Sequence, residues 1–87
     1  MPTTSKVQLI ADERAAEAAV IQAEYDARKA ELTGDADAIA LARKAVDDAR
    51  TESFKIRKVM TDGLAQWHAY DSEQELARTA RELGIAP

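Results

Sequence analysis

Small and apolar residues recur along residues 36–70 at alternating steps of three and four positions. This alternation places every member on one stripe of a single helix. The side chains of the stripe are mostly small in its first half and mostly bulky in its second. Such a stripe predicts a contact surface for another helix rather than a reaction site. Its members are Ile39, Ala42, Val46, Ala49, Ser53, Ile56, Met60, Gly63, Trp67 and Tyr70.

A second series with the same spacing occupies the first third of the chain. Neither Gly nor Pro occurs between Ser5 and Leu32, and alanine, the best helix former, recurs throughout. The sequence therefore predicts a helix over 5–32, capped by Thr4 or Ser5. Its predicted contact stripe consists of Val7, Ala11, Arg14, Ala18, Ile21, Tyr25, Arg28 and Leu32.

A short turn separates the two helices at 33–35. Gly34 suits the left-handed position that follows a helix end. Asp35 or Asp37 suits the N-cap of the next helix, where a negative charge is favourable. A connection this short places the two helices antiparallel, so we expect a helical hairpin.

The second helix is predicted over 36–70, and its one weak point is Gly63. Glycine in a helix interior costs about 1 kcal/mol relative to alanine. A kink or break remains open there, but Met60, Gly63 and Trp67 keep their phase, which favours a continuous helix.

A short third helix is predicted over 73–83. Ser72 followed three residues later by Glu75 forms a capping-box pattern. Gly84 suits its C-terminal cap, with Ile85 beyond it. The predicted fold is thus all-α, a single domain over 1–87 that forms a long, coiled-coil-like antiparallel hairpin with a short C-terminal helix.

The position of the turn sets the expected register between the helices. With the turn near residue 34, Tyr25 should lie beside Lys44, and Val7 beside Gly63. The end of the second helix, from Trp67 onward, should then extend past the first helix. The C-terminal helix can fold back over it, or a neighbouring subunit must cover it.

The second half of the second helix has a broader apolar surface than one partner helix can bury. The excess indicates a third helix or another molecule, and Trp and Tyr are enriched at the energetic centres of interfaces. We therefore predict an interface composed of Phe54, Ile56, Val59, Met60, Leu64, Trp67 and Tyr70.

Composition adds a reason to expect association. The chain has 87 residues and is 46% hydrophobic, but 19 of its residues are alanine, which buries little area. So small a core leaves a monomer marginally stable. A homo-oligomer, or a complex with another helical protein, would relieve this.

Charge and composition argue against several classes of partner. The net charge of −4 disfavours binding to nucleic acid or to an anionic membrane. The chain has no cysteine, and no apolar run approaches a membrane span. The segment 1–13 lacks the apolar core of a signal peptide. We expect a soluble protein, cytoplasmic or within a macromolecular assembly.

Candidate catalytic and metal-binding groups are sparse. His68 has Asp71 nearby but no further ligand, so a metal site is incomplete. No serine has a base placed beside it, and the three glycines are isolated. We expect no enzyme activity, cofactor, metal or small-molecule substrate.

One cluster of basic residues lies within the second helix. It can be a phosphate-binding patch, but the predicted register places it opposite acidic residues of the first helix. We interpret it as a source of cross-hairpin ion pairs. The basic residues are Lys55, Arg57 and Lys58, and the acidic ones Asp12, Glu13 and Glu17.

These observations favour a non-enzymatic structural or interaction module that self-associates or docks onto a larger assembly. One alternative is a small helical component of a phage particle or another macromolecular assembly. Another is an adaptor or regulator that binds a different protein. A nucleic-acid-linked regulator ranks behind both because of the net charge.

Overall fold

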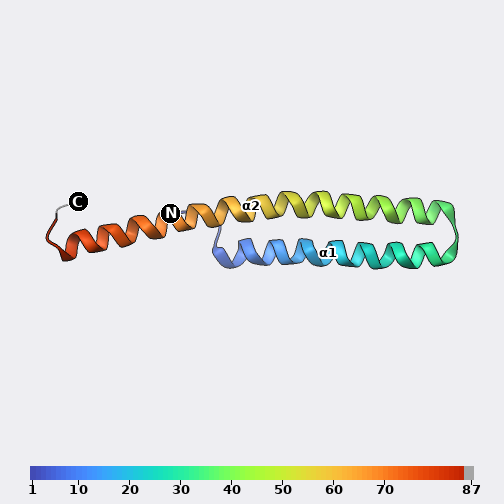
Figure 1. Ribbon diagram of the computed structural model, residues 1–87, viewed down its shortest axis with the longest axis horizontal. Helices are drawn as coiled ribbons and strands as arrows, with labels where there is room; N and C mark the ends of the chain where they lie inside the picture. The colour runs from blue at the N-terminus through green and yellow to red at the C-terminus, as the bar shows by residue number, and fades with distance from the viewer. Residues whose placement is uncertain (86–87) are drawn as a thin grey trace.

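The computed structural model describes residues 1–85, which fold into two long antiparallel helices (Figure 1). Helix α1 comprises Lys6–Thr33, and helix α2 comprises Ala36–Glu82. Together they form a rod whose Cα atoms extend over 74 × 13 × 13 Å. The predicted all-α hairpin is confirmed.

Side chains and backbone at the helix ends stabilise the hairpin as predicted. The Ser5 hydroxyl accepts a hydrogen bond from the Gln8 N–H at 3.1 Å and so caps α1. Gly34 adopts φ +70°, a left-handed conformation that side chains disfavour. The Asp35 carboxylate accepts hydrogen bonds from the amides of Asp37 and Ala38, which caps α2.

The structure differs from the prediction in having no separate C-terminal helix. The segment predicted over 73–83 is the last part of α2, which continues without interruption to Glu82. Neither Gly nor Pro lies between Gly63 and Gly84, so the capping-box residues stay inside the helix, where its own backbone satisfies their amides. Gly84, with φ +76°, ends α2, and the Ile85 N–H donates to the Ala80 carbonyl at 2.8 Å.

The predicted contact stripe of α2 is confirmed along its whole length. All ten of its members, from Ile39 to Tyr70, are buried or half-buried. Val46 and Ser53 are the most completely enclosed of them, with 8% and 6% of their surface exposed. The alternating spacing therefore identified the face of α2 that α1 covers as far as Gly63, beyond which the start of the chain contacts Trp67.

The predicted contact stripe of α1 was wrong. All eight of its members, from Val7 to Leu32, are exposed and lie on the side of α1 away from α2; we call this set the outer stripe. A different series with the same spacing is buried or half-buried against α2. The inward residues are Leu9, Glu13, Ala16, Val20, Ala23, Ala27 and Ala30.

Charge explains which face of α1 turns inward. The outer stripe contains Arg14 and Arg28, and burying either guanidinium against the apolar stripe of α2 would be costly without a partner. The inward series contains one charged residue, Glu13, whose carboxylate lies 3.8 Å from the Arg57 guanidinium. Its four alanines also allow the two backbones to approach closely.

Gly63 accommodates the most deeply buried large side chain. Leu9 is only 3% exposed, and a Cβ added at Gly63 would lie 2.6 Å from its Cδ1 atom. The register thus differs from the prediction, since Leu9 rather than Val7 lies against Gly63. Glycine is tolerated inside α2 because it makes the space that Leu9 fills.

Candidate interaction surface

The seven residues of the predicted interface divide into two groups. Phe54 and Val59 are exposed, with 72% and 62% of their surface accessible. The other five are half-buried and lie on or beside the stripe that α1 covers. That group comprises Ile56, Met60, Leu64, Trp67 and Tyr70.

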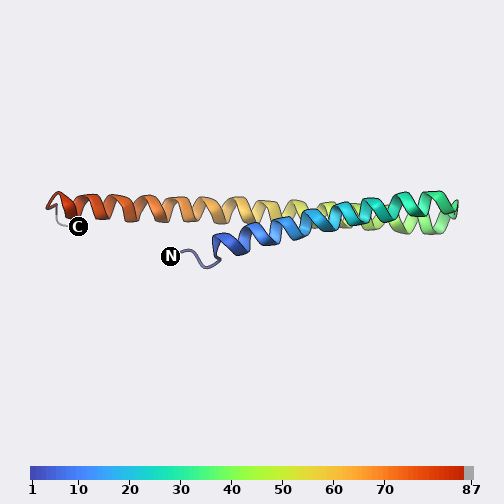
Figure 2. The same cartoon turned by 90° about the horizontal axis from the view of Figure 1, so that it is seen from below.

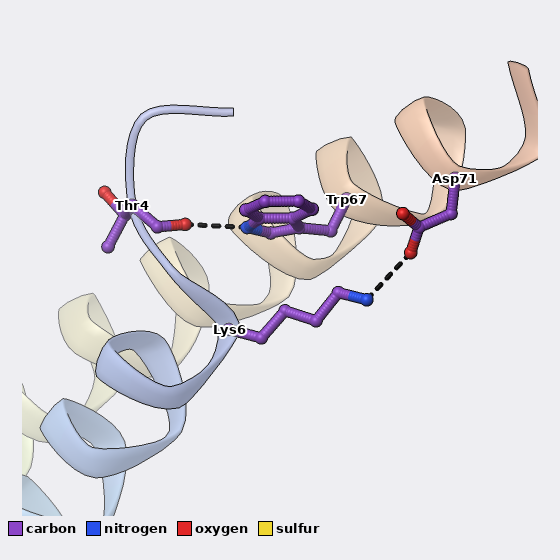
Figure 3. Close-up of polar contacts among 4 residues, drawn as sticks. All are labelled: Thr4, Lys6, Trp67 and Asp71. Carbon is purple, nitrogen blue, oxygen red and sulfur yellow. Dashed lines mark hydrogen bonds and ion pairs between the residues drawn. The ribbon is translucent and has the colours of Figure 1, made fainter. Parts of the chain in front are cut away.

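The start of the chain, rather than a folded-back C-terminal helix, partly covers Trp67 (Figure 3). The indole Nε1 donates a hydrogen bond to the Thr4 carbonyl at 2.6 Å. The Lys6 ammonium lies 5.3 Å from the centre of the Trp67 ring and 2.7 Å from the Asp71 carboxylate. The rings of Tyr70 and Trp67 pack at right angles, with their centres 5.7 Å apart. These contacts anchor residues 4–6 to α2.

One flank of the hairpin contains an apolar groove between the helices. Its volume is about 410 Å³ and it is open to solvent. Small alanine side chains line the α1 side, which allows another helix to approach closely. The lining residues are Leu9, Asp12, Ala15, Ala16, Ile56, Val59 and Met60.

The opposite flank carries a ladder of ion pairs between the helices. The Arg50 guanidinium lies 3.0 Å from the Glu24 carboxylate, and both side chains are about half exposed. One similar pair lies on each side of it along the rod. They are Arg43 with Glu31 at 3.7 Å and Arg57 with Glu13 at 3.8 Å.

The sequence contained a signal for this ladder. Arg43, Arg50 and Arg57 recur at steps of seven, and so do Glu17, Glu24 and Glu31. Residues seven apart lie on one side of a coiled-coil helix, so each set forms a row. Two of the three pairs follow these rows, whereas Arg57 pairs with Glu13 instead of Glu17. The sequence interpretation considered only the basic cluster of Lys55, Arg57 and Lys58. Of these, Arg57 forms a cross-hairpin pair. Lys55 and Lys58 form no ion pair within residues 1–85.

The last part of α2 extends beyond α1 without a helix beside it (Figures 1 and 2). The final ion pair between the helices joins Lys6 to Asp71, so residues 72–82, about 16 Å of helix, have no counterpart in α1. Leu76 in this segment is 72% exposed, and Leu83, directly after it, is 71% exposed. We call residues 72–82 the α2 tail.

The outer stripe of α1 exposes large apolar side chains along most of that helix. Val7, Ile21, Tyr25 and Leu32 have between 58% and 89% of their surface accessible. The stripe spans 26 residues, about 38 Å of helix, and Arg14 and Arg28 interrupt its apolar residues. At its edge, Ile21 and Arg28 line grooves that α1 shares with α2, and the Lys29 ammonium lies 4.8 Å from the centre of the Tyr25 ring.

Groups suited to metal binding are not gathered anywhere in the described chain. Within residues 1–85, no three His, Asp or Glu side chains lie together as a metal site would require. His68 is exposed on α2. Neither α1 nor α2 is both long and apolar enough to span a membrane.

Comparisons with known proteins gave no match. The chain matched no protein-family model, no curated protein and no solved structure.

Proposed function

We propose that the protein is a non-enzymatic structural or interaction module that self-associates or docks onto a larger assembly through apolar helix surface. The observation that carries this proposal is an imbalance between core and surface. The hairpin buries four apolar residues, of which only Leu9 and Val46 are larger than alanine. Within residues 1–85, twelve large apolar residues stay exposed.

Two physical arguments connect this imbalance to association. A core this small provides little stabilisation from burial, so an isolated hairpin is marginal. Contiguous exposed apolar surface on a protein of this size commonly marks an interaction site. Packing of exposed helix faces against partner helices would supply the missing burial.

The predicted interface is retained in part in this proposal. Phe54 and Val59, together with the rim of the apolar groove, are the members available to a partner. Met60 lies beside Leu9 and Ala16 in that groove, so a charged residue there would disrupt the hairpin as well as any interface. Substitutions that test association therefore belong at exposed positions.

Light scattering across a size-exclusion peak, at several protein concentrations, tests the proposal. We expect a mass above that of one chain, and a melting temperature that rises with concentration because association stabilises the folded form. A single-chain mass and a concentration-independent melting temperature would contradict self-association. The module would then be an adaptor for a different protein, or a small component of a phage particle or another assembly.

A further inference from the structure

We propose that residues 1–4 form a releasable strap over Trp67, and that the ion pair between Lys6 and Asp71 holds this strap closed. The strap is a conformational device within one chain: when it opens, the hairpin stays folded and the Trp67 indole becomes exposed. Opening and closing do not depend on the proposed function. The use of the strap to control a contact surface rests on that function, because Trp67 belongs to the predicted interface.

The strap is attached to α2 at few points. Residues 1–4 precede the N-cap of α1, form no helix, and are exposed except for Pro2, which is half-buried. Within residues 1–85, the bond from the Trp67 indole to the Thr4 carbonyl is the one hydrogen bond that joins the strap to α2. A pocket of about 230 Å³ separates part of the strap from α2. The strap therefore lies over α2 without packing closely against it.

The Lys6 side chain holds the strap at the end nearest to α1 (Figure 3). Its ammonium lies 2.7 Å from the Asp71 carboxylate and 5.3 Å from the centre of the Trp67 ring. Lys6 follows Thr4 by two residues, so loss of the ion pair removes the side-chain attachment beside the strap. Both side chains of the pair are about half exposed, so the pair is weak and is screened by salt. Such a pair suits a contact that opens and closes.

The hairpin is stabilised by contacts that do not include the strap. The Ser5 hydroxyl caps α1 by accepting a hydrogen bond from the Gln8 N–H. Leu9, which is 3% exposed, fills the space beside Gly63 in the next part of the helix. Neither contact involves residues 1–4, so the strap can open while α1 keeps its place on α2.

The surface under the strap is aromatic. Helix α1 covers the contact stripe of α2 as far as Gly63, and the strap contacts Trp67 beyond it. The Tyr70 ring packs at right angles to the indole, with ring centres 5.7 Å apart. Trp and Tyr are enriched among the residues that dominate binding energy at protein interfaces. The strap thus determines whether this aromatic surface is accessible.

Quenching of fluorescence by acrylamide tests the strap, because Trp67 is the single tryptophan of the chain. Asp71→Asn would remove the ion pair and leave Lys6 in place. We expect the ratio of open to closed chains to rise about 1.5- to 5-fold, as the loss of an exposed ion pair implies, and quenching to increase with it. The matched control is Asp48→Asn, which removes the exposed Lys44–Asp48 pair of α2 and should quench like the parent.

Salt and charge reversal provide readouts that a purely structural contact would not change. Added salt should raise quenching of the parent toward that of Asp71→Asn and should affect the variant less. Lys6→Glu should open the strap further, because two carboxylates would then lie together. Combining it with Asp71→Lys should close the strap again. All of these variants should keep the parent's helix content by circular dichroism.

The possible results separate this inference from the proposed function. Equal quenching of Asp71→Asn and the parent would overturn the strap. A loss of helix content in Asp71→Asn would also overturn it, because the contact would then be part of the folded hairpin. The measurements are made at a dilution that gives a single-chain mass, so association does not affect them. A parent that stays a single chain at every concentration would contradict self-association, and its quenching would still decide whether the strap exists.

Discussion

At the scale of single residues, packing at the open end of the hairpin depends on Gly63 and Leu9. Glycine lowers the intrinsic stability of α2 by about 1 kcal/mol relative to alanine. The structure shows the compensation, because Leu9, the least exposed large residue, occupies the space that a side chain at position 63 would need.

Gly63→Ala should therefore destabilise the protein although it improves helix propensity. Overpacking of a filled site costs typically about 1–3 kcal/mol, which exceeds the gain of about 1 kcal/mol in propensity. We expect the free energy of unfolding, measured by urea denaturation, to fall by about 1 kcal/mol.

The matched control is the same substitution in a Leu9→Ala background. Once the leucine is removed, Gly63→Ala should raise the free energy of unfolding, because only the propensity term remains. Equal effects in both backgrounds would show that the two residues are not coupled.

The sequence indicated the importance of Gly63 but not its partner. Keeping Met60, Gly63 and Trp67 in phase predicted a continuous helix, which the structure confirms. The partner was missed because two series on α1 share the same spacing, and spacing alone cannot rank them. Counting charges would have done so, since one series contains Arg14 and Arg28 and the other only Glu13.

At the scale of elements, the ion-pair ladder sets how the two helices face each other. Arginines of α2 and glutamates of α1 meet on one flank, while the other flank holds the apolar groove. Rotating α1 to bring its outer stripe inward would separate the ladder pairs. The ladder and the alanine series thus favour the same orientation of α1.

Reversing one charge in the ladder tests its contribution. Arg50→Glu would place two carboxylates together and should lower the free energy of unfolding by about 0.5–1 kcal/mol, a small effect because both side chains are exposed. The swap that combines it with Glu24→Arg should recover most of the loss. A swap no more stable than the single variant would show that this pair does not contribute, and high salt should reduce all of these differences.

The α2 tail is predicted to be the least stable part of either helix. Helices of this length are marginal in water unless a neighbouring element packs against them. No part of α1 lies beside the tail, because α1 begins at Lys6, which pairs with Asp71 just before it. Hydrogen exchange at a dilution that gives a single-chain mass should show faster amide exchange over 72–82 than over 46–60. Equal protection at that dilution would mean that another part of the chain covers the tail.

The end of α2 shows where local sequence signals mislead. Ser72 and Glu75 fit a capping box, but such a pattern caps a helix only where the chain already leaves it. No residue between Gly63 and Gly84 breaks the helix, so the pattern has no effect. Gly34 and Gly84, by contrast, adopt positive φ values and end their helices as the sequence predicted.

At the scale of the whole molecule, the hairpin is a thin rod with almost no interior. A rod two helices thick leaves at least half of each helix surface exposed, so apolar stripes on the outer faces have no intramolecular partner. Composition predicted this shortage of core, and spacing predicted the hairpin. Neither could decide which of the two stripes on α1 lies inside.

The orientation of α1 is the central claim, and thiol reactivity tests it most directly. Ala16→Cys and Ala18→Cys lie two positions apart on the same helix. Ala16 faces α2 and has only 8% of its surface exposed, whereas Ala18 lies on the exposed outer stripe. Their rates of reaction with a maleimide would be compared at a low protein concentration. We predict that Ala18→Cys reacts many times faster than Ala16→Cys. Faster reaction at position 16 would place the outer stripe inside the hairpin and contradict the orientation of α1.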